Sequence, residues 1–168
     1  MVLNSEKSPR EMTAEEIQAR IIQLGFGGDR ARFEIFCEKL RQELPPKTGV
    51  ALRGSVVTAE SWEDGSPFDA AGPGSSDLDV TLIGSKVMEH WLEEAFYIPA
   101  LHTKPLCDKD CEIAPALNPL REALQAMVGR PVSFQATSNI ILFARDILLG
   151  QPYFTIIEAE EACDSEAA

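Results

Sequence analysis

The chain has 168 residues, 45% of them hydrophobic, and its 27 acidic and 15 basic residues give a net charge of −12. This length and composition predict one globular domain with a substantial core. So acidic a chain is a poor non-specific binder of nucleic acid or anionic membrane. No apolar run reaches the roughly 18 residues that a membrane helix needs, and the N-terminus lacks the apolar centre of a signal peptide. We therefore expect a cytoplasmic protein.

Apolar periodicity, interrupted by glycine and proline, predicts helices that alternate with short strands. Thr13 and Glu16 form a capping-box pattern that begins the first helix. Residues 97–116, which contain prolines and have no clear period, are expected to be irregular. The expected elements are helices over 13–24, 30–44, 56–62, 86–96, 117–128 and 139–149, and strands over 50–53, 78–83 and 132–136.

This alternation indicates an α/β (α+β) chain with a small mixed sheet flanked by helices. The expected organisation is a flexible leader over 1–12, one domain over 13–157 and an acidic tail over 158–168. The tail, EAEEACDSEAA, carries five acids and no base, which is typical of a frayed terminus.

Two acids lie two positions apart at the start of the strand expected over 78–83. Asp77 and Asp79 therefore project to the same side, where their charges repel. A metal ion, an arginine or exposure to water must offset that repulsion, and Mg²⁺ commonly binds a pair of carboxylates together with substrate phosphates. The alternative is a strand entry with one capping acid and one exposed acid.

Gly54 and Ser55 lie at the expected start of a helix. Backbone N–H groups there, with the serine hydroxyl, can hold a phosphate. The alternative is a simple turn with an N-cap serine.

These segments resemble the nucleotidyltransferase superfamily related to DNA polymerase beta, over about residues 48–155. The family signature is an apolar strand, then Gly-Ser opening a helix, then Asp-x-Asp on the next strand. It reads here as LRGS followed by SDLDVTLIG. Downstream, LREALQAMVGRPVSFQA looks like the family's helix, turn and third strand, and NIILFARDILLGQPYF like the segment that follows. The chain is identified as a compact single-domain member.

The resemblance implies a function and a set of site residues. Gly54 and Ser55 would be nucleotide-binding residues that contact the phosphates. Asp77 and Asp79 would be catalytic residues that hold one or two Mg²⁺ ions. The implied reaction moves an NMP from an NTP to a hydroxyl, and the acidic charge favours a small-molecule or protein acceptor over nucleic acid.

Two features depart from the family pattern. Ser55 and Asp77 are 22 positions apart, a longer connection than compact members use, so the loop over 63–74 is expected to be a lid at the site or a disordered surface loop. The family's third strand carries a third carboxylate, whereas this chain offers Ser133 and Gln135 there. The loop acids that are candidates to replace it are Asp69, Asp108, Asp110 and Glu112.

The missing carboxylate supports an alternative function. A catalytically degenerate member would keep the fold and act as a binding or regulatory module. Larger family members hold the acceptor with a second helical domain, so a homodimer or a partner chain is expected to supply that surface here.

Other residues have less specific signals. Arg53 is expected to pair with a phosphate or with Asp77. Cys107 and Cys111, with His102 nearby, suggest zinc, but closed zinc sites usually show a second close pair, so free thiols are favoured.

Overall fold

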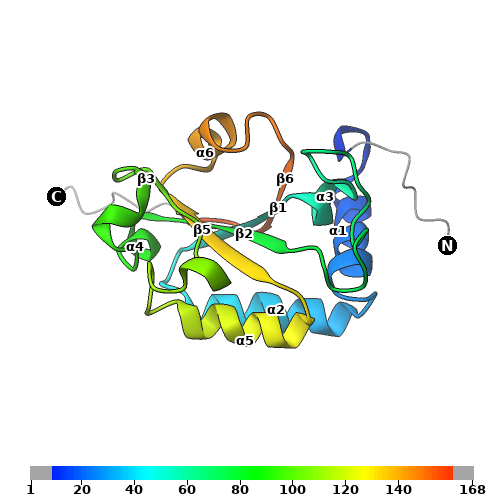
Figure 1. Cartoon of the computed structure of the whole chain (residues 1–168), viewed down its shortest axis with the longest axis horizontal. Coiled ribbons are helices and arrows are strands. Elements are labelled where there is room, and N and C mark those ends of the chain that lie inside the picture. Colours follow the sequence, from blue (N-terminus) through cyan, green and yellow to red (C-terminus); the bar gives the residue numbers. More distant parts are fainter. Residues whose placement is uncertain (1–8, 161–168) are drawn as a thin grey trace.

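The computed structural model describes residues 9–160, and within this range six strands form one sheet (Figure 1). The sheet order is β3-β4-β5-β2-β1-β6. Strands β2 and β5 run parallel and the other neighbouring pairs run antiparallel. The strands are β1 (Gly49–Arg53), β2 (Leu78–Ile83), β3 (Phe96–Ile98), β4 (His102–Thr103), β5 (Val132–Thr137) and β6 (Tyr153–Ile157). The prediction of a mixed sheet flanked by helices is confirmed.

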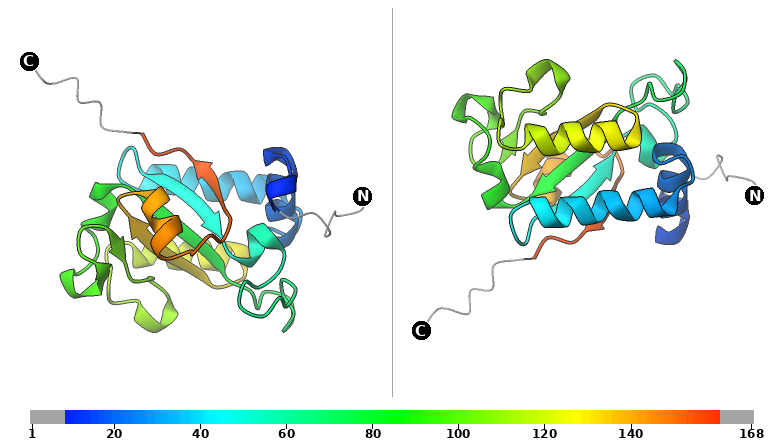
Figure 2. Two further views of the ribbon diagram at one scale, coloured as in Figure 1. Left: turned by 90° about the horizontal axis from the view of Figure 1, so that it is seen from above. Right: turned by 90° about the horizontal axis from the view of Figure 1, so that it is seen from below.

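The helices lie on both faces of this sheet, with α2 and α5 on one face and α6 on the other (Figures 1 and 2). The α-helices are α1 (Ala14–Gly25), α2 (Arg30–Glu43), α3 (Ser55–Thr58), α4 (Ser85–Met88), α5 (Asn118–Val128) and α6 (Ile140–Asp146). Short 3₁₀ turns are η1 (Pro9–Glu11), η2 (Glu93–Ala95) and η3 (Asp108–Asp110). Within the described range, no helix combines the length and apolar character that crossing a membrane requires.

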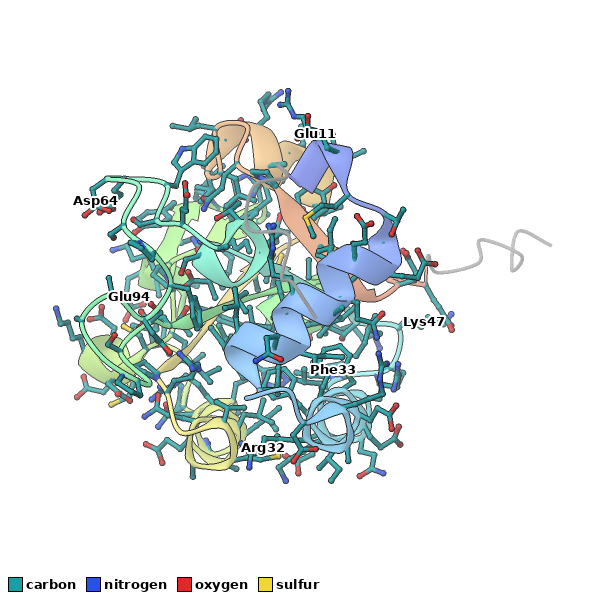
Figure 3. All side chains as sticks on the ribbon, turned by 90° about the vertical axis from the view of Figure 1, so that its right-hand side faces the viewer. Glu11, Arg32, Phe33, Lys47, Asp64 and Glu94 are labelled. Atoms are coloured by element: carbon teal, nitrogen blue, oxygen red, sulfur yellow. The ribbon has the colours of Figure 1, made fainter. Side chains whose placement is uncertain are left out.

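The alternation of residues along the strands gives the sheet two different faces. The register aligns Leu52, Val80 and Phe134, which are fully buried and belong to the main core with residues of α2 and α5. Figure 3 shows Phe33 of α2 directed into this core while Arg32 points outward. We call this side of the sheet the apolar face.

The opposite side, which we call the polar face, carries the intervening residues. The register aligns Arg53 with Asp79 and Asp79 with Ser133, and Thr81 with Gln135 one step along. Part of this face is covered by α6. The polar face therefore extends over β1, over β2, which carries the Asp-x-Asp motif, and over β5, which follows Gly129 and Arg130.

Local sequence signals account for the long helices. Thr13 and Glu16 form the predicted capping box, with reciprocal hydrogen bonds of 3.2 Å. Asp29 caps α2 by accepting the N–H of Arg32 (3.1 Å), and Gly129 ends α5 in the left-handed conformation. The predicted helices over 13–24, 30–44 and 117–128 are confirmed.

Several other elements differ from the prediction. Helix α3 ends at Thr58 because Ala59 is left-handed (φ 66°), and α6 ends at Asp146. Helix α4 ends at Met88 instead of about 96, and Phe96 begins a strand. Strands β3, β4 and β6 were not predicted. They are short and pair with partners set by the tertiary fold, which local periodicity does not reveal.

The loop after α3 is fastened by an ion pair. Arg130 contacts both carboxylate oxygens of Asp69, at 2.8 and 3.1 Å. The same carboxylate accepts the N–H groups of Ser76 (2.9 Å) and Gly74 (3.3 Å). The hydrogen bonds from Arg130 lower the pKa of Asp69 to about 2. These contacts connect residues 69–76 to Arg130, and both alternatives for the loop over 63–74, a lid or a disordered surface loop, stay predictions.

The expected termini fall largely outside the described residues. The leader predicted over 1–12 is described only from residue 9, where η1 begins, and the acidic tail only as far as residue 160. Figure 3 shows Glu11 and Lys47 at the surface of the described part.

Candidate functional site

Gly54 brings the β1–α3 turn into direct contact with the Asp-x-Asp strand. Its φ of +81° lies in the region that favours glycine. A Cβ at this position would lie 2.7 Å from Oδ2 of Asp79, closer than atoms pack. The predicted phosphate-binding residues and the predicted metal ligands are therefore neighbours in space, although the loop between them is long.

The first turn of α3 leaves hydrogen-bond donors available. The N–H groups of Val57 and Thr58 both donate to the carbonyl of Gly54. In the described part of the chain, the N–H groups of Ser55 and Val56 have no backbone acceptor. These donors and the Ser55 hydroxyl lie at the start of the turn, beside Asp79.

Asp79 is held in place by its neighbour on β5. Ser133 Oγ donates a 2.9 Å hydrogen bond to Asp79 Oδ1, as expected for side chains at the same register position on adjacent parallel strands. Ser133 is buried and Asp79 half-buried. One oxygen of Asp79 is thus fixed by Ser133 and the other lies against Gly54.

Asp77 carries an uncompensated charge. Within residues 9–160 it makes no hydrogen bond and no ion pair. Its pKa is raised, first because neighbouring groups partly exclude water and then because Asp79 and Asp108 carry the same charge. Asp77 is exposed by surface area, so water weakens these repulsions without removing them. A site that gathers like charges in this way favours a cation.

Arg53 does not pair with Asp77, which corrects that alternative. Its Nη2 donates to Gln135 Oε1 (2.8 Å), and its guanidinium carbon lies 5.7 Å from the centroid of the Phe143 ring. Gln135 is oriented by a 2.8 Å bond from Nε2 to the carbonyl of Thr103. The guanidinium therefore extends across β2 over the polar face, without a carboxylate partner among the described residues.

The loop acids do not supply a third carboxylate ligand. Asp69 is engaged by Arg130. Asp108 lines a cavity of about 370 Å³ with Asp77 and Ser133, but Arg121 (3.0 Å) and Gln125 (3.2 Å) bind its carboxylate. Asp110 and Glu112 do not line this cavity.

Within residues 9–160, no group of three or more His, Cys, Asp and Glu side chains is arranged to hold a metal ion. The acids Asp77 and Asp79 thus form a pair, with Ser133 as the polar group beside them on β5.

The zinc alternative finds no support. His102 is fully buried, and both ring nitrogens have partners: Nδ1 lies 2.9 Å from Thr137 Oγ1 and Nε2 lies 3.0 Å from Asp146 Oδ2. Cys107 and Cys111 are free and half-buried. His102 instead links β4 to β5 and α6.

Two features of the site have no local sequence signal. The bond between Arg53 and Gln135 joins residues 82 positions apart. Asp108 approaches Asp77 because the segment after β4 lies beside α5, where Arg121 and Gln125 hold it. The alternation of strand residues could have placed Arg53 and Gln135 on one face, but only the strand order makes β2 the strand between them.

Comparison with protein-family models, curated proteins and solved structures finds no match. The geometry of the polar face therefore carries the functional argument.

Proposed function

We propose that this chain is a metal-dependent nucleotidyltransferase with a DNA polymerase beta-like fold. It moves an NMP from an NTP to a hydroxyl of a small molecule or protein. The single observation that carries the proposal is the contact between Gly54 and Asp79, where a Cβ would come within 2.7 Å of the carboxylate. This contact brings a phosphate-binding turn and a carboxylate pair together, as the chemistry requires.

The donor set at Asp77 and Asp79 fits Mg²⁺. Both are hard oxygen ligands. Asp77 has no partner among the described residues, and its pKa is raised first by partial exclusion of water and then by the like charges of Asp79 and Asp108. Mg²⁺ usually keeps several waters and takes only one or two protein carboxylates, with substrate phosphates completing its coordination. When bound here, Mg²⁺ would supply charge neutralisation at the phosphates and lower the pKa of the attacking hydroxyl.

The residues of the chain itself bind and orient the substrate. The N–H groups of Ser55 and Val56 and the Ser55 hydroxyl donate to the phosphates at the start of α3. Ser133 restricts Asp79 to one orientation. In the reaction, the acceptor hydroxyl gives its proton to water and its oxygen forms a bond to the α-phosphorus. The bond from the α-phosphorus to the oxygen that bridges to the β-phosphate breaks, and pyrophosphate leaves.

The net charge of the chain supports the proposed class of acceptor. A net charge of −12 opposes a second polyanion on the same surface, so a small molecule or a protein side chain is favoured over a polynucleotide.

A second candidate function rests on Ser133. The register places this hydroxyl beside Asp79, where the resembled family has a third carboxylate that activates the acceptor. A module that binds the nucleotide without transferring it needs no such base, and loss of a general base typically costs about 10² to 10⁴ in rate.

Calorimetric titration of each NTP, with and without Mg²⁺, tests the nucleotide site. We expect Mg²⁺-dependent binding to wild type and none to Asp79→Asn. Asp110→Asn, which removes an exposed acid outside the cavity, is the matched control and should bind normally. Equal binding of an NTP by wild type and Asp79→Asn would contradict the proposal.

Label transfer separates the two candidates. An NTP labelled at the α-phosphate is incubated with wild type, Mg²⁺ and a panel of hydroxyl acceptors. Transfer that Asp79→Asn abolishes supports the enzyme. Binding with release of no pyrophosphate supports the binding module.

A further inference from the structure

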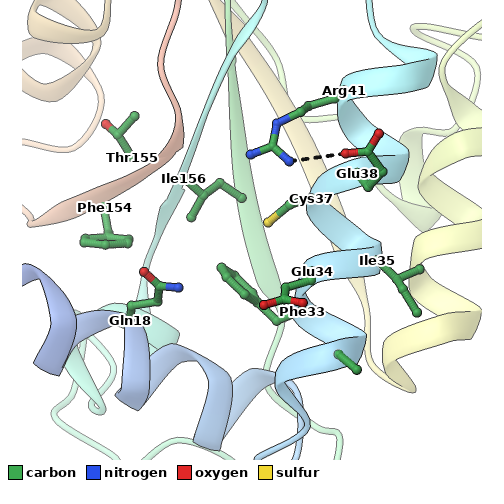
Figure 4. Close-up of a pocket in the computed structure, with 11 residues that line it drawn as sticks. Gln18, Phe33, Glu34, Ile35, Cys37, Glu38, Arg41, Phe154, Thr155 and Ile156 are labelled. Atoms are coloured by element: carbon green, nitrogen blue, oxygen red, sulfur yellow. Dashed lines mark hydrogen bonds and ion pairs between the residues drawn. The ribbon is translucent and has the colours of Figure 1, made fainter.

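A hollow on the described surface lies away from the proposed nucleotide site. A groove of about 600 Å³ runs between α2 and β6 (Figure 4). Its lining includes the apolar side chains of Phe33, Cys37, Phe154 and Ile156. Burial raises the pKa of the Cys37 thiol to about 11, so this cysteine is a protonated, apolar part of the wall rather than a nucleophile.

The strand that forms one wall of the groove is an open sheet edge. Strand β6 pairs with β1 on one side and, within residues 9–160, with no strand on the other. Its sequence YFTII is uncharged and rich in aromatic and β-branched residues. A row of free backbone donors and acceptors on such a strand is a template for pairing with another chain.

The other edge of the sheet is better protected. Strand β3 has only three residues, is irregularly paired with β4 and is followed directly by Pro99. Short length, irregular pairing and proline are common ways to prevent pairing at an edge. Strand β6 has an irregularity toward β1, but all five of its residues are half-buried and four of them are hydrophobic.

Charged side chains of α2 border the groove. Glu34, Glu38 and Arg41 line it and are exposed, and Arg41 Nη1 lies 3.5 Å from Glu38 Oε2 within the helix (Figure 4). Gln18 of α1 also lines the groove. The lining on the two walls spans residues 31–41 on α2 and 154–156 on β6, so the middle of these walls lies near Cys37 and Thr155. A two-fold axis at that midpoint places Glu34 of one copy opposite Arg41 of the second copy, and the reverse. Glu38 then lies nearest the axis, where Arg41 of the same helix offsets its charge.

We propose that a second copy of this chain docks on this edge, through antiparallel pairing of the two β6 strands about a two-fold axis near Thr155. Such an interface is isologous, since each copy presents the same surface to the other. The two sheets become continuous, and the apolar walls of both grooves are buried. Strand β1 separates β6 from β2, so Asp77 and Asp79 stay accessible in the dimer.

Sedimentation equilibrium over roughly 1 to 200 µM protein, at about 0.15 M salt, measures the association. Wild type is expected to show a concentration-dependent dimer. Glu34→Arg and Arg41→Glu, each on its own, should weaken it about tenfold, because the symmetry places two like-charge pairs in the interface. The double variant Glu34→Arg/Arg41→Glu should restore the wild-type association.

Glu63→Arg is the matched control. It makes the same charge change as Glu34→Arg but lies in the exposed loop after α3. Both changes lower the net negative charge, which by itself favours association. If Glu34→Arg weakens the dimer and Glu63→Arg does not, the surface of α2 is part of the interface.

Hydrogen exchange gives a second readout. Amides of residues 153–157 should exchange more slowly at high protein concentration, whereas those of β3 should not change. A monomer at all concentrations would overturn the proposal. A dimer that tolerates both single reversals, or that leaves β6 exchange unchanged, would overturn it equally.

Discussion

The two faces of the sheet are built from alternate residues of the same strands, yet they have different roles. On one face, Leu52, Val80 and Phe134 are fully buried in the main core. On the other, the charged side chains of Arg53 and Asp79 are half-buried beside the buried polar side chains of Ser133 and Gln135. The apolar face supplies folding energy through buried area, while the polar face accepts electrostatic strain at Asp77. Burial of the apolar face therefore offsets the small electrostatic cost at Asp77.

The largest contrast is expected between neighbours on β5. Phe134→Ala removes a fully buried ring from the apolar face and should lower the free energy of unfolding by about 4 kcal/mol. Ser133→Ala, one position away on the polar face, should lower it by about 1 kcal/mol, the worth of one hydrogen bond. Denaturant unfolding measures both, and similar losses would contradict the division of the two faces.

The loop ion pair should give the next largest effect. Asp69→Asn leaves the Arg130 side chain, which is only 8% exposed, without its carboxylate and should cost about 3 kcal/mol. Asp64→Asn, at the exposed tip of the same loop (Figure 3), should leave the free energy of unfolding close to that of wild type.

The same pair predicts a pH dependence. The pKa of Asp69 is about 2 in the folded chain and about 3.9 when unfolded. Its stabilisation of about 2 kcal/mol is complete above about pH 4 and is lost as the pH falls toward 2. Unfolding measured between pH 5 and 2 should show this loss in wild type and a shallower one in Asp69→Asn.

Gly54→Ala should be destabilising by about 2 kcal/mol, through both the positive φ and the contact with Asp79. Gly65→Ala separates the two causes, since Gly65 has a similar φ of +73° and nothing within 4 Å of an added Cβ. An equal cost at both positions would mean that the Gly54–Asp79 contact adds nothing.

The smallest expected effect is an increase in the free energy of unfolding. Asp77→Asn relieves repulsion from Asp79 and Asp108, so the variant should be more stable by a few tenths of a kcal/mol near pH 7. Because the pKa of Asp77 is raised on folding, this gain should vanish as the pH falls and wild-type Asp77 becomes protonated. Thermal unfolding at pH 7 and pH 4 measures the difference, and a less stable variant at pH 7 would contradict it.

Local patterns predict much of this fold because they act within one element. The capping box at Thr13, the apolar stripe of α2 and the β-branched run of β2 each depend on near neighbours, and each is confirmed. Strand β6 and the end of α4 depend on which edges and surfaces the rest of the chain leaves open. Propensity alone does not decide such cases.

The candidate site, too, is only partly predictable from local sequence patterns. Strand alternation is enough to predict Asp77 and Asp79 on one side, while the pairing of β2 with β5 places Ser133 beside Asp79. The contact of Gly54 with Asp79 and the approach of Asp108 require the strand order and the path of two loops. Those long-range contacts follow from the whole fold, so no short segment encodes them.

The central claim is that the charges of the polar face are retained for a ligand rather than for stability. Denaturant unfolding of wild type and Asp77→Asn, each with and without Mg²⁺ and an equimolar mixture of the four NTPs, tests it most directly. We expect the ligands to stabilise wild type, by about 2.7 kcal/mol at a hundredfold excess over the dissociation constant, and to leave the variant, itself at least as stable without ligand, unchanged. Equal stabilisation of both proteins, or of neither, would contradict the account.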